Sequence, residues 1–244
     1  MSDTDDFARQ VAEAIEGIGD DEELRSLALD VLRRATAHRY AHYFTWLGRP
    51  IIQTPEDIVV MQEIVWRTRP ELIVETGIAR GGSAIFHASL MELTGADGKV
   101  IAIDTDIRAH NRRDIEAHPL YSRIELIEGS STDAAVLERV RAEAAGRGRV
   151  MVVLDSNHTH EHVLAELHLY SPIVTKGAYL VVCDTAIESL PDDMWHDRAW
   201  GRGDNPMTAV RKFLETSDRF EVDHMLSQKL LMTANPSGHL RCIR

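Results

Sequence analysis

The sequence predicts an α/β protein with a doubly wound, mostly parallel seven-stranded sheet and a helical appendage at its N-terminus. Two observations lead to this fold class. Short apolar runs alternate with helical patterns from residue 70 onward, which is typical of βαβ units and a parallel sheet. Continuous apolar runs such as Val150–Leu154 suit strands that are covered on both faces. We therefore expect an N-terminal helical extension over residues 1–54 and one main domain over residues 55–244.

Two helices are expected in the N-terminal part, over residues 5–18 and 21–39. In the second, leucines recur at helical spacing, and Asp20 and Asp21 suit its start. Residues 40–55 are rich in aromatics and are closed by two prolines, so we expect a loop. The next helix is expected to start at Thr54, its cap, with Pro55 in its first turn. It is expected to end before Pro70.

The main domain then alternates between the two kinds of element. Strands are expected over residues 72–75, 100–104, 124–128, 150–155 and 178–184, with helices over 83–93, 111–117, 133–145 and 161–174 between them. A long irregular stretch over 185–204 precedes a helix over 206–214. Residues 220–224 and 229–233 suit two last strands paired as a hairpin.

Charge and composition exclude several classes of function. The chain has 244 residues and a net charge of −12, so it offers no general basic field for nucleic acid. Ten acids and two bases fall within residues 1–30, which predicts a solvated N-terminal surface. No apolar run reaches the length of a membrane span, and the acidic start is unlike a secretory signal. With only two cysteines, the chain is expected in the reducing cytoplasm.

The residues that follow the first strand predict a nucleotide-like ligand, because ligands in such sheets bind beyond the carboxyl ends of strands. In the turn from Glu75 to Ser83, Gly77 permits a tight turn, Gly81 allows close approach of the backbone, and Ser83 can cap the next helix. The second strand ends in Asp104, whose carboxylate can accept hydrogen bonds from both hydroxyls of a ribose.

Binding sites for two cofactors, NAD and S-adenosylmethionine, both carry an acid at the end of the second strand. Glu75 stands where a pyrophosphate would approach the backbone, and a carboxylate repels a pyrophosphate but suits a sulfonium or an amino acid. The sequence therefore favours S-adenosylmethionine. After the third strand, Ser130 and Ser131 lie where an adenine ring would end, although each serine is equally compatible with a plain turn.

Carboxylates also end the fourth and fifth strands. If these strands are neighbours, Asp155 and Asp184 face each other, and a divalent cation resolves their repulsion. Oxygen ligands favour Mg²⁺. The alternative is that the two carboxylates point apart as helix caps. His158 is the candidate general base because its ordinary pKa lies near the working pH, whereas His160 and His162 suit solvated positions.

Together these residues resemble the cephalosporin hydroxylase / rhamnosyl O-methyltransferase family of class I S-adenosylmethionine-dependent methyltransferases. The resemblance covers about residues 40–244, and the segments that carry it are Pro50–Asp57, Glu75–Ser83, Ile103–Arg108, Glu128–Ser131, Leu154–His158 and Asn205–Pro206. It implies a Rossmann-like methyltransferase fold. It also implies that Glu75, Gly77, Ala79, Gly81, Ser83, Asp104, Ser130 and Ser131 hold S-adenosylmethionine, and that Asp155 and Asp184 hold Mg²⁺.

The chain departs from the family at one position. The family has Glu-Asp at the end of the fifth strand, and here it is Cys183-Asp184, a thiol that is a poor partner for Mg²⁺. The acidic N-terminal helices are similar to a family element that serves assembly, so a homo-oligomer is expected.

The expected function is methylation of a hydroxyl of a small natural product, such as a sugar or an antibiotic precursor. Asp155 and His158 would carry the chemistry, assisted by metal, with residues 192–204 as a lid. Two alternatives stay open: a hydroxylase component of antibiotic biosynthesis, and a protein that binds S-adenosylmethionine without turnover.

Overall fold

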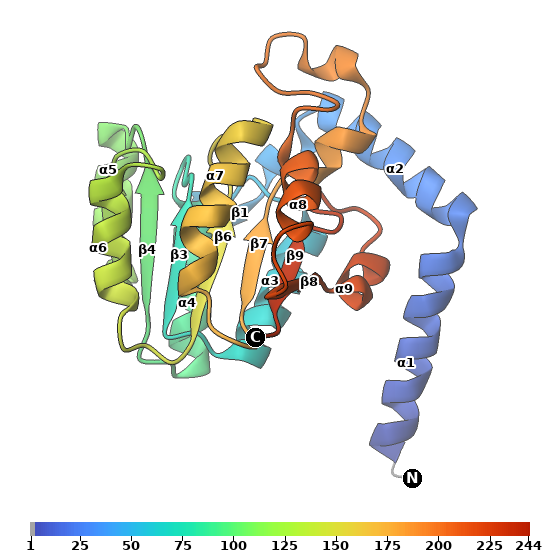
Figure 1. Cartoon of the computed structure of the whole chain (residues 1–244), viewed down its shortest axis with the longest axis horizontal. Helices are drawn as coiled ribbons and strands as arrows, with labels where there is room; N and C mark the ends of the chain where they lie inside the picture. The colour runs from blue at the N-terminus through green and yellow to red at the C-terminus, as the bar shows by residue number, and fades with distance from the viewer. Residues whose placement is uncertain (1–2) are drawn as a thin grey trace.

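The computed structural model describes residues 3–244 and has a seven-stranded sheet in the order β5-β4-β3-β6-β7-β9-β8. Figure 1 shows this sheet as the centre of the molecule. Its strands are β3 (Leu72–Thr76), β4 (Lys99–Asp104), β5 (Ile124–Glu128), β6 (Val150–Leu154), β7 (Tyr179–Val182), β8 (Phe220–Val222) and β9 (His239–Cys242). The five strands from β5 to β7 are parallel, and β9 runs antiparallel to both of its neighbours. The predicted mostly parallel seven-stranded sheet is confirmed.

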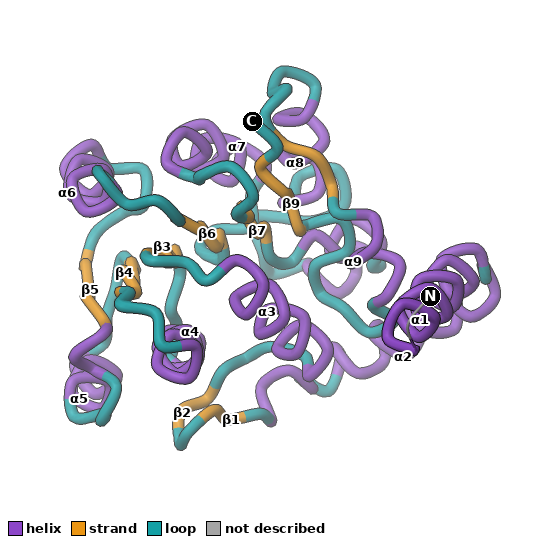
Figure 2. The backbone as a smooth tube through the Cα atoms, turned by 90° about the horizontal axis from the view of Figure 1, so that it is seen from below, coloured by secondary structure: helices purple, strands orange, loops and turns teal. Residues whose placement is uncertain are grey.

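Helices cover both faces of the sheet, as Figure 2 shows. One face carries α3 (Pro55–Thr68), α4 (Gly82–Thr94) and α5 (Ala109–Glu116), and the other carries α6 (Ala134–Ala144), α7 (His160–Tyr170) and α8 (Pro206–Leu214). All five residues of β3 and of β6 are buried, because each of these strands lies between two others and under helices on both sides. This explains their continuous apolar sequence.

The chain between the N-terminal helix α2 (Glu22–Ala37) and α3 is more ordered than the expected loop. A 3₁₀ helix (Tyr40–Tyr43) leads into two short antiparallel strands, β1 (Thr45–Trp46) and β2 (Arg49–Pro50). The indole of Trp46 packs edge-on against Phe86 and donates a hydrogen bond to Ser89, both on α4. These aromatic residues therefore fix the segment against the helix that follows the glycine turn.

The prediction of a last strand over residues 229–233 was wrong. Residues His224–Lys229 form the helix α9, capped by the side chain of Asp223, and the last strand is β9. The backbone N–H groups of residues 231, 232 and 234 donate instead to Glu56 and Asp57 at the start of α3. Because carboxylates accept hydrogen bonds from these backbone donors, the donors are not available to pair with a neighbouring strand.

The two N-terminal helices, α1 (Asp3–Asp20) and α2 (Glu22–Ala37), project from the body as an arm in Figure 1. None of the described residues of α1 is buried, whereas Leu32 on α2 packs with Ala186 and Leu190. The arm thus meets the body in two places: Arg25 at the start of α2 donates to the backbone carbonyls of Ser227 and Gln228 on α9, and Leu32 packs near the end of α2. None of the helices within residues 3–244 is long and apolar enough to cross a membrane.

Candidate active site

A cavity of about 480 Å³ lies at the carboxyl end of the sheet, where the ends of β3, β4, β5 and β6 meet. It is the position at which ligands bind in open α/β sheets. Five of the eight predicted cofactor-binding residues line this cavity: Gly77, Ala79, Ser83, Asp104 and Ser131. The glycine turn and the acid of the second strand therefore line one hollow.

Gly77 fixes the contact between the turn and the next strand. Its φ is +80°, and a Cβ atom at this position would overlap the backbone carbonyl of Asp155. Only glycine satisfies both requirements without strain. The turn after β3 consequently rests on the first residue after β6, which brings Asp155 to the edge of the cavity.

Asp104 links the second strand to the glycine turn. Its Oδ2 atom accepts hydrogen bonds from the backbone N–H groups of Ile78 (3.0 Å) and Ala79 (3.2 Å), and its Oδ1 atom accepts from Asp106 (3.1 Å). Each carboxylate oxygen has two lone pairs, so Oδ2 is fully used by the turn while Oδ1 retains one lone pair for a ligand. The structure thus fixes the orientation of the acid that was assigned to a ribose.

Glu75, Gly81 and Ser130 do not line the cavity among residues 3–244. Glu75 is fully buried one layer below it, with Oε2 lying 3.4 Å from Nδ1 of the equally buried His87. Within the described chain neither side chain has a hydrogen-bond partner. Burying polar groups without hydrogen bonds is unfavourable, and the close approach of these two side chains offsets part of that cost.

His162 was expected to be solvated, but it belongs to a polar network in the lining of the cavity. Its Nε2 atom lies within hydrogen-bond distance of the hydroxyls of Ser131 (3.2 Å) and Ser156 (3.1 Å). The hydroxyl of Ser156 also donates to the buried Glu166. The spacing of His158 and His162 places both residues on one side of a helix, but no local pattern could show that Ser131, which follows a different strand, meets His162.

Three potential metal ligands gather at the end of the cavity: Asp155, His158 and Asp184. Each offers one ligand atom, and these atoms all lie within 4.8 Å of one another. Burial and the charge of Asp184 raise the pKa of the Asp155 carboxyl well above its ordinary value. The two acids predicted to face each other are thus together, and the alternative of carboxylates that point apart is not what the structure shows.

Cys183 does not belong to this group. Its thiol is buried in the core on the side of α3 and α4, and burial raises the pKa of this thiol well above its ordinary value. Asp184 reaches the group because its backbone is left-handed (φ +56°), with its N–H donating to the side chain of Asn235 (2.8 Å). His158, not Cys183, is the third side chain beside the two aspartates.

A second and larger cavity, of about 1020 Å³, meets the first at the same group. Ile52, Asp155, His158, Asp184 and Trp200 line both cavities. The ring of Trp200 packs edge-on against His158 with 4.8 Å between ring centroids. These shared residues form the boundary between the two hollows.

Asp57 also lines the larger cavity, and the sequence analysis missed it. Its carboxylate is buried at the start of α3, where it accepts hydrogen bonds from Thr54, Thr233 and the backbone of Ala234. Burial raises the pKa of Asp57 to about 6. In the sequence it is indistinguishable from an ordinary acid in the first turn of a helix.

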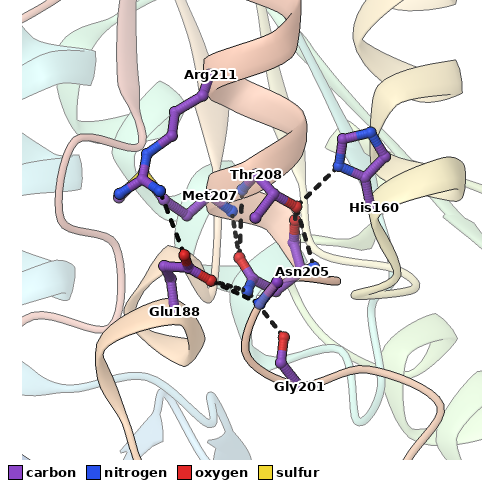
Figure 3. Close-up of polar contacts among 8 residues, drawn as sticks. His160, Glu188, Gly201, Asn205, Met207, Thr208 and Arg211 are labelled. Atoms are coloured by element: carbon purple, nitrogen blue, oxygen red, sulfur yellow. Dashed lines mark hydrogen bonds and ion pairs between the residues drawn. The ribbon is translucent and has the colours of Figure 1, made fainter.

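A buried network around Asn205 holds the base of the 185–204 segment, as Figure 3 shows. The amide of Asn205 donates to Glu188 (2.6 Å) and to the carbonyl of Gly201 (2.8 Å), while its oxygen caps α8. Glu188 also accepts from Arg211, and Thr208 contacts His160. The segment that carries Trp200 is therefore tied to the starts of α7 and α8.

Comparison with known proteins identifies the family. The family model described as Rhamnosyl O-methyltransferase/CmcI matches residues 38–243. The chain belongs to this family. Membership confirms the family and the enzyme class, an O-methyltransferase, that the motifs predicted. The match begins directly after α2. It therefore includes the whole seven-stranded sheet and the strand ends that line the two cavities.

Curated members of the Rhamnosyl O-methyltransferase/CmcI family come from mycobacteria. The Rhamnosyl O-methyltransferase of Mycobacterium tuberculosis is 31% identical over 198 residues, which are 80% of this chain and 77% of that protein. The protein of the same name from Mycobacterium leprae is 34% identical over 148 residues, 60% of this chain and 62% of its own length.

Solved structures share the fold. A structure of CmcI with Mg and SAM has a TM-score of 0.58 and 20% identity, and the match covers 83% of this chain and 78% of that one. The O-methyltransferase from Bacillus cereus in complex with SAH has a TM-score of 0.53 and 18% identity, with 82% of each chain covered. The predicted methyltransferase-like fold is confirmed.

Proposed function

We propose that the chain is an S-adenosylmethionine-dependent O-methyltransferase that methylates a hydroxyl of a sugar-bearing small molecule, assisted by a divalent metal. The observation that carries the proposal is the junction of the two cavities: the hollow lined by the glycine turn and Asp104 opens onto Asp155, His158 and Asp184. The names of the mycobacterial relatives support a rhamnosyl acceptor, and the CmcI structure with Mg and SAM supports both cofactors.

The smaller cavity would hold the methyl donor. Backbone at Gly77 and Ala79 can approach the ligand closely, and Asp104 presents carboxylate oxygens from the next strand. Ser83 and Ser131 add hydroxyls to the lining of the hollow. Glu75, Gly81 and Ser130 would act from below the surface by fixing the turns. S-adenosylmethionine, when bound, supplies a methyl group on a positively charged sulfur.

The residues present fit a divalent metal. Two carboxylates and one imidazole offer ligand atoms that lie within 4.8 Å of one another, and burial together with the charge of Asp184 raises the pKa of Asp155. Asp155 and Asp184 would hold Mg²⁺, whose ligands are oxygen atoms. The metal, when bound, supplies positive charge that favours the ionised form of an acceptor hydroxyl.

His158 would serve as the general base. Its Nε2 atom lies 3.3 Å from Oδ2 of Asp184, so the carboxylate stabilises the imidazolium that forms when the proton arrives. Trp200 on the other side limits the orientations of the ring. His158 takes the proton from the acceptor hydroxyl, and the oxygen then bonds to the methyl carbon as the carbon–sulfur bond breaks.

We also propose that the chain assembles through its N-terminal arm. Phe7 and Val11 on α1 and Leu27 and Val31 on α2 are exposed apolar side chains on an otherwise acidic surface. Light scattering during size exclusion tests this. We expect Phe7→Asp to lower the molar mass, whereas Val59→Asp, exposed on α3, leaves it unchanged. A monomeric parent chain would contradict the proposal.

The function is tested by methyl transfer from labelled S-adenosylmethionine to a panel of phenols, rhamnosides and macrolide sugars. We expect a methylated acceptor and stoichiometric S-adenosylhomocysteine, with a rate that falls on addition of EDTA and returns with Mg²⁺. Binding of the donor without product across the panel would indicate a binding protein instead. Oxygen consumption coupled to product would indicate a hydroxylase.

A further inference from the structure

The end of α2 and the turn after it form one wall of the larger cavity. Residues 32–42 line this wall, and residues 187–200 line the opposite one, with Asp155, His158 and Asp184 at the inner end. Figure 1 shows α2 running from the arm toward this segment. The N-terminal extension is thus part of a hollow that reaches the reacting groups.

A small apolar core joins the two walls. Leu32 of α2 packs with Ala186 and Leu190, and Met194 and Trp195 lie against this group. The position of Trp195 therefore depends on the N-terminal helix. The Asn205 network holds the base of the segment, and this core adds an apolar contact between its outer part and α2.

Two tryptophans on the wall present unused hydrogen-bond donors. The Nε1 atoms of Trp195 and Trp200 are buried and have no acceptor anywhere in residues 3–244. A buried donor without a partner is unfavourable, so an oxygen atom of a ligand that reaches it is bound more tightly. Both indoles line the cavity.

We propose that this cavity is the acceptor site, that the N-terminal helix α2 completes it, and that Trp195 is a specificity-determining residue. The inference rests on the proposed function. The volume of the larger cavity, about 1020 Å³, reaches the upper end of the range for drug-sized ligand sites. The acceptor is therefore an oxygen-rich molecule of several rings, such as a glycoside with a bulky aglycone, and not a free monosaccharide.

The experiment uses the full chain and three rhamnosides of increasing size: methyl α-L-rhamnopyranoside, p-nitrophenyl α-L-rhamnopyranoside and quercitrin. We expect KM to fall as the aglycone grows. Trp195→Phe removes the N–H donor and keeps an aromatic ring, and should raise KM for the largest acceptor about three- to tenfold. The kcat value and the affinity for S-adenosylhomocysteine should change little. Trp66→Phe, an exposed tryptophan on α3, is the matched control.

Leu32→Ala tests the role of α2, with Leu93→Ala, exposed on α4, as its control. We expect KM for the largest acceptor to rise and the affinity for S-adenosylhomocysteine to persist, which shows that the main domain is folded. Methylation with unchanged KM in both test variants, or equal KM across the three rhamnosides, overturns the acceptor assignment and leaves the transferase function intact. No product from any acceptor in the panel overturns both.

Discussion

The Nε2 atom of His158 lies 3.3 Å from the Oδ2 atom of Asp184, across the ends of two neighbouring parallel strands. The register of β6 and β7 pairs Leu154 with Val182, which sets Cys183 level with Asp155. Asp184 lies one residue further on, and its left-handed backbone turns it toward His158. This arrangement joins a candidate base to a carboxylate that is also a candidate metal ligand.

Replacing His158 by alanine should lower kcat about 10²–10⁴-fold, the usual contribution of a general base. Affinity for S-adenosylhomocysteine should stay within a small factor, because the glycine turn and Asp104 form the other end of the cavity. Calorimetry and initial rates measure the two effects. His110→Ala, an exposed histidine on α5, is the control. Turnover that survives in the His158 variant would remove this residue as the base.

Asp104→Ala should weaken the binding of S-adenosylhomocysteine by at least about tenfold, since the variant loses the Oδ1 acceptor for the ligand and the two bonds from Oδ2 to the glycine turn. Isothermal titration calorimetry gives the dissociation constant directly. Asp106→Ala, an exposed acid two residues later, should bind like the parent chain. Equal affinity in the two variants would place the donor elsewhere.

Gly77→Ala should destabilise the fold and abolish donor binding, because the added methyl group meets the carbonyl of Asp155 and φ is +80°. Gly146→Ala separates the two causes: its φ is +79°, but a Cβ atom there has no neighbour within 4 Å. The control should cost only the backbone strain of about 1–2 kcal/mol and keep binding. Urea unfolding and calorimetry compare them; a Gly77 variant no worse than the control would contradict the packing argument.

The buried Asp57 should make stability depend on pH. Its carboxyl has an ordinary pKa of 3.8 in the unfolded chain and a pKa of about 6 when folded. Between these values the folded state binds more protons, so this residue's contribution makes the free energy of unfolding fall as pH rises from about 4 to about 6 and stay level above. The full effect is on the order of 3 kcal/mol.

Urea unfolding at several pH values between 4.5 and 7 measures that slope. In Asp57→Asn the slope should be smaller than in the parent chain, whatever the absolute stability of the variant. The exposed Asp106→Asn is the control and should keep the parent slope. An unchanged slope in Asp57→Asn would show that this carboxyl titrates as if it were solvated.

The sequence by itself determined the sheet, its helices and the strand ends that carry chemistry. Periodicity reports which faces are buried, and Gly77, Asp104, Asp155 and Asp184 follow apolar strands whose carboxyl ends must meet at one edge. The last strand was misplaced because Glu56 and Asp57 take the backbone donors of residues 231–234, a long-range contact that no local pattern contains.

Only the tertiary structure decided which of these residues meet. The register of β6 and β7 and the left-handed backbone at Asp184 put His158, rather than Cys183, beside the two aspartates. Folding also brought Leu32 of the N-terminal helix against Trp195, more than 160 positions later in the sequence. Such contacts depend on the path of the chain through space, whereas local patterns record only burial along one element.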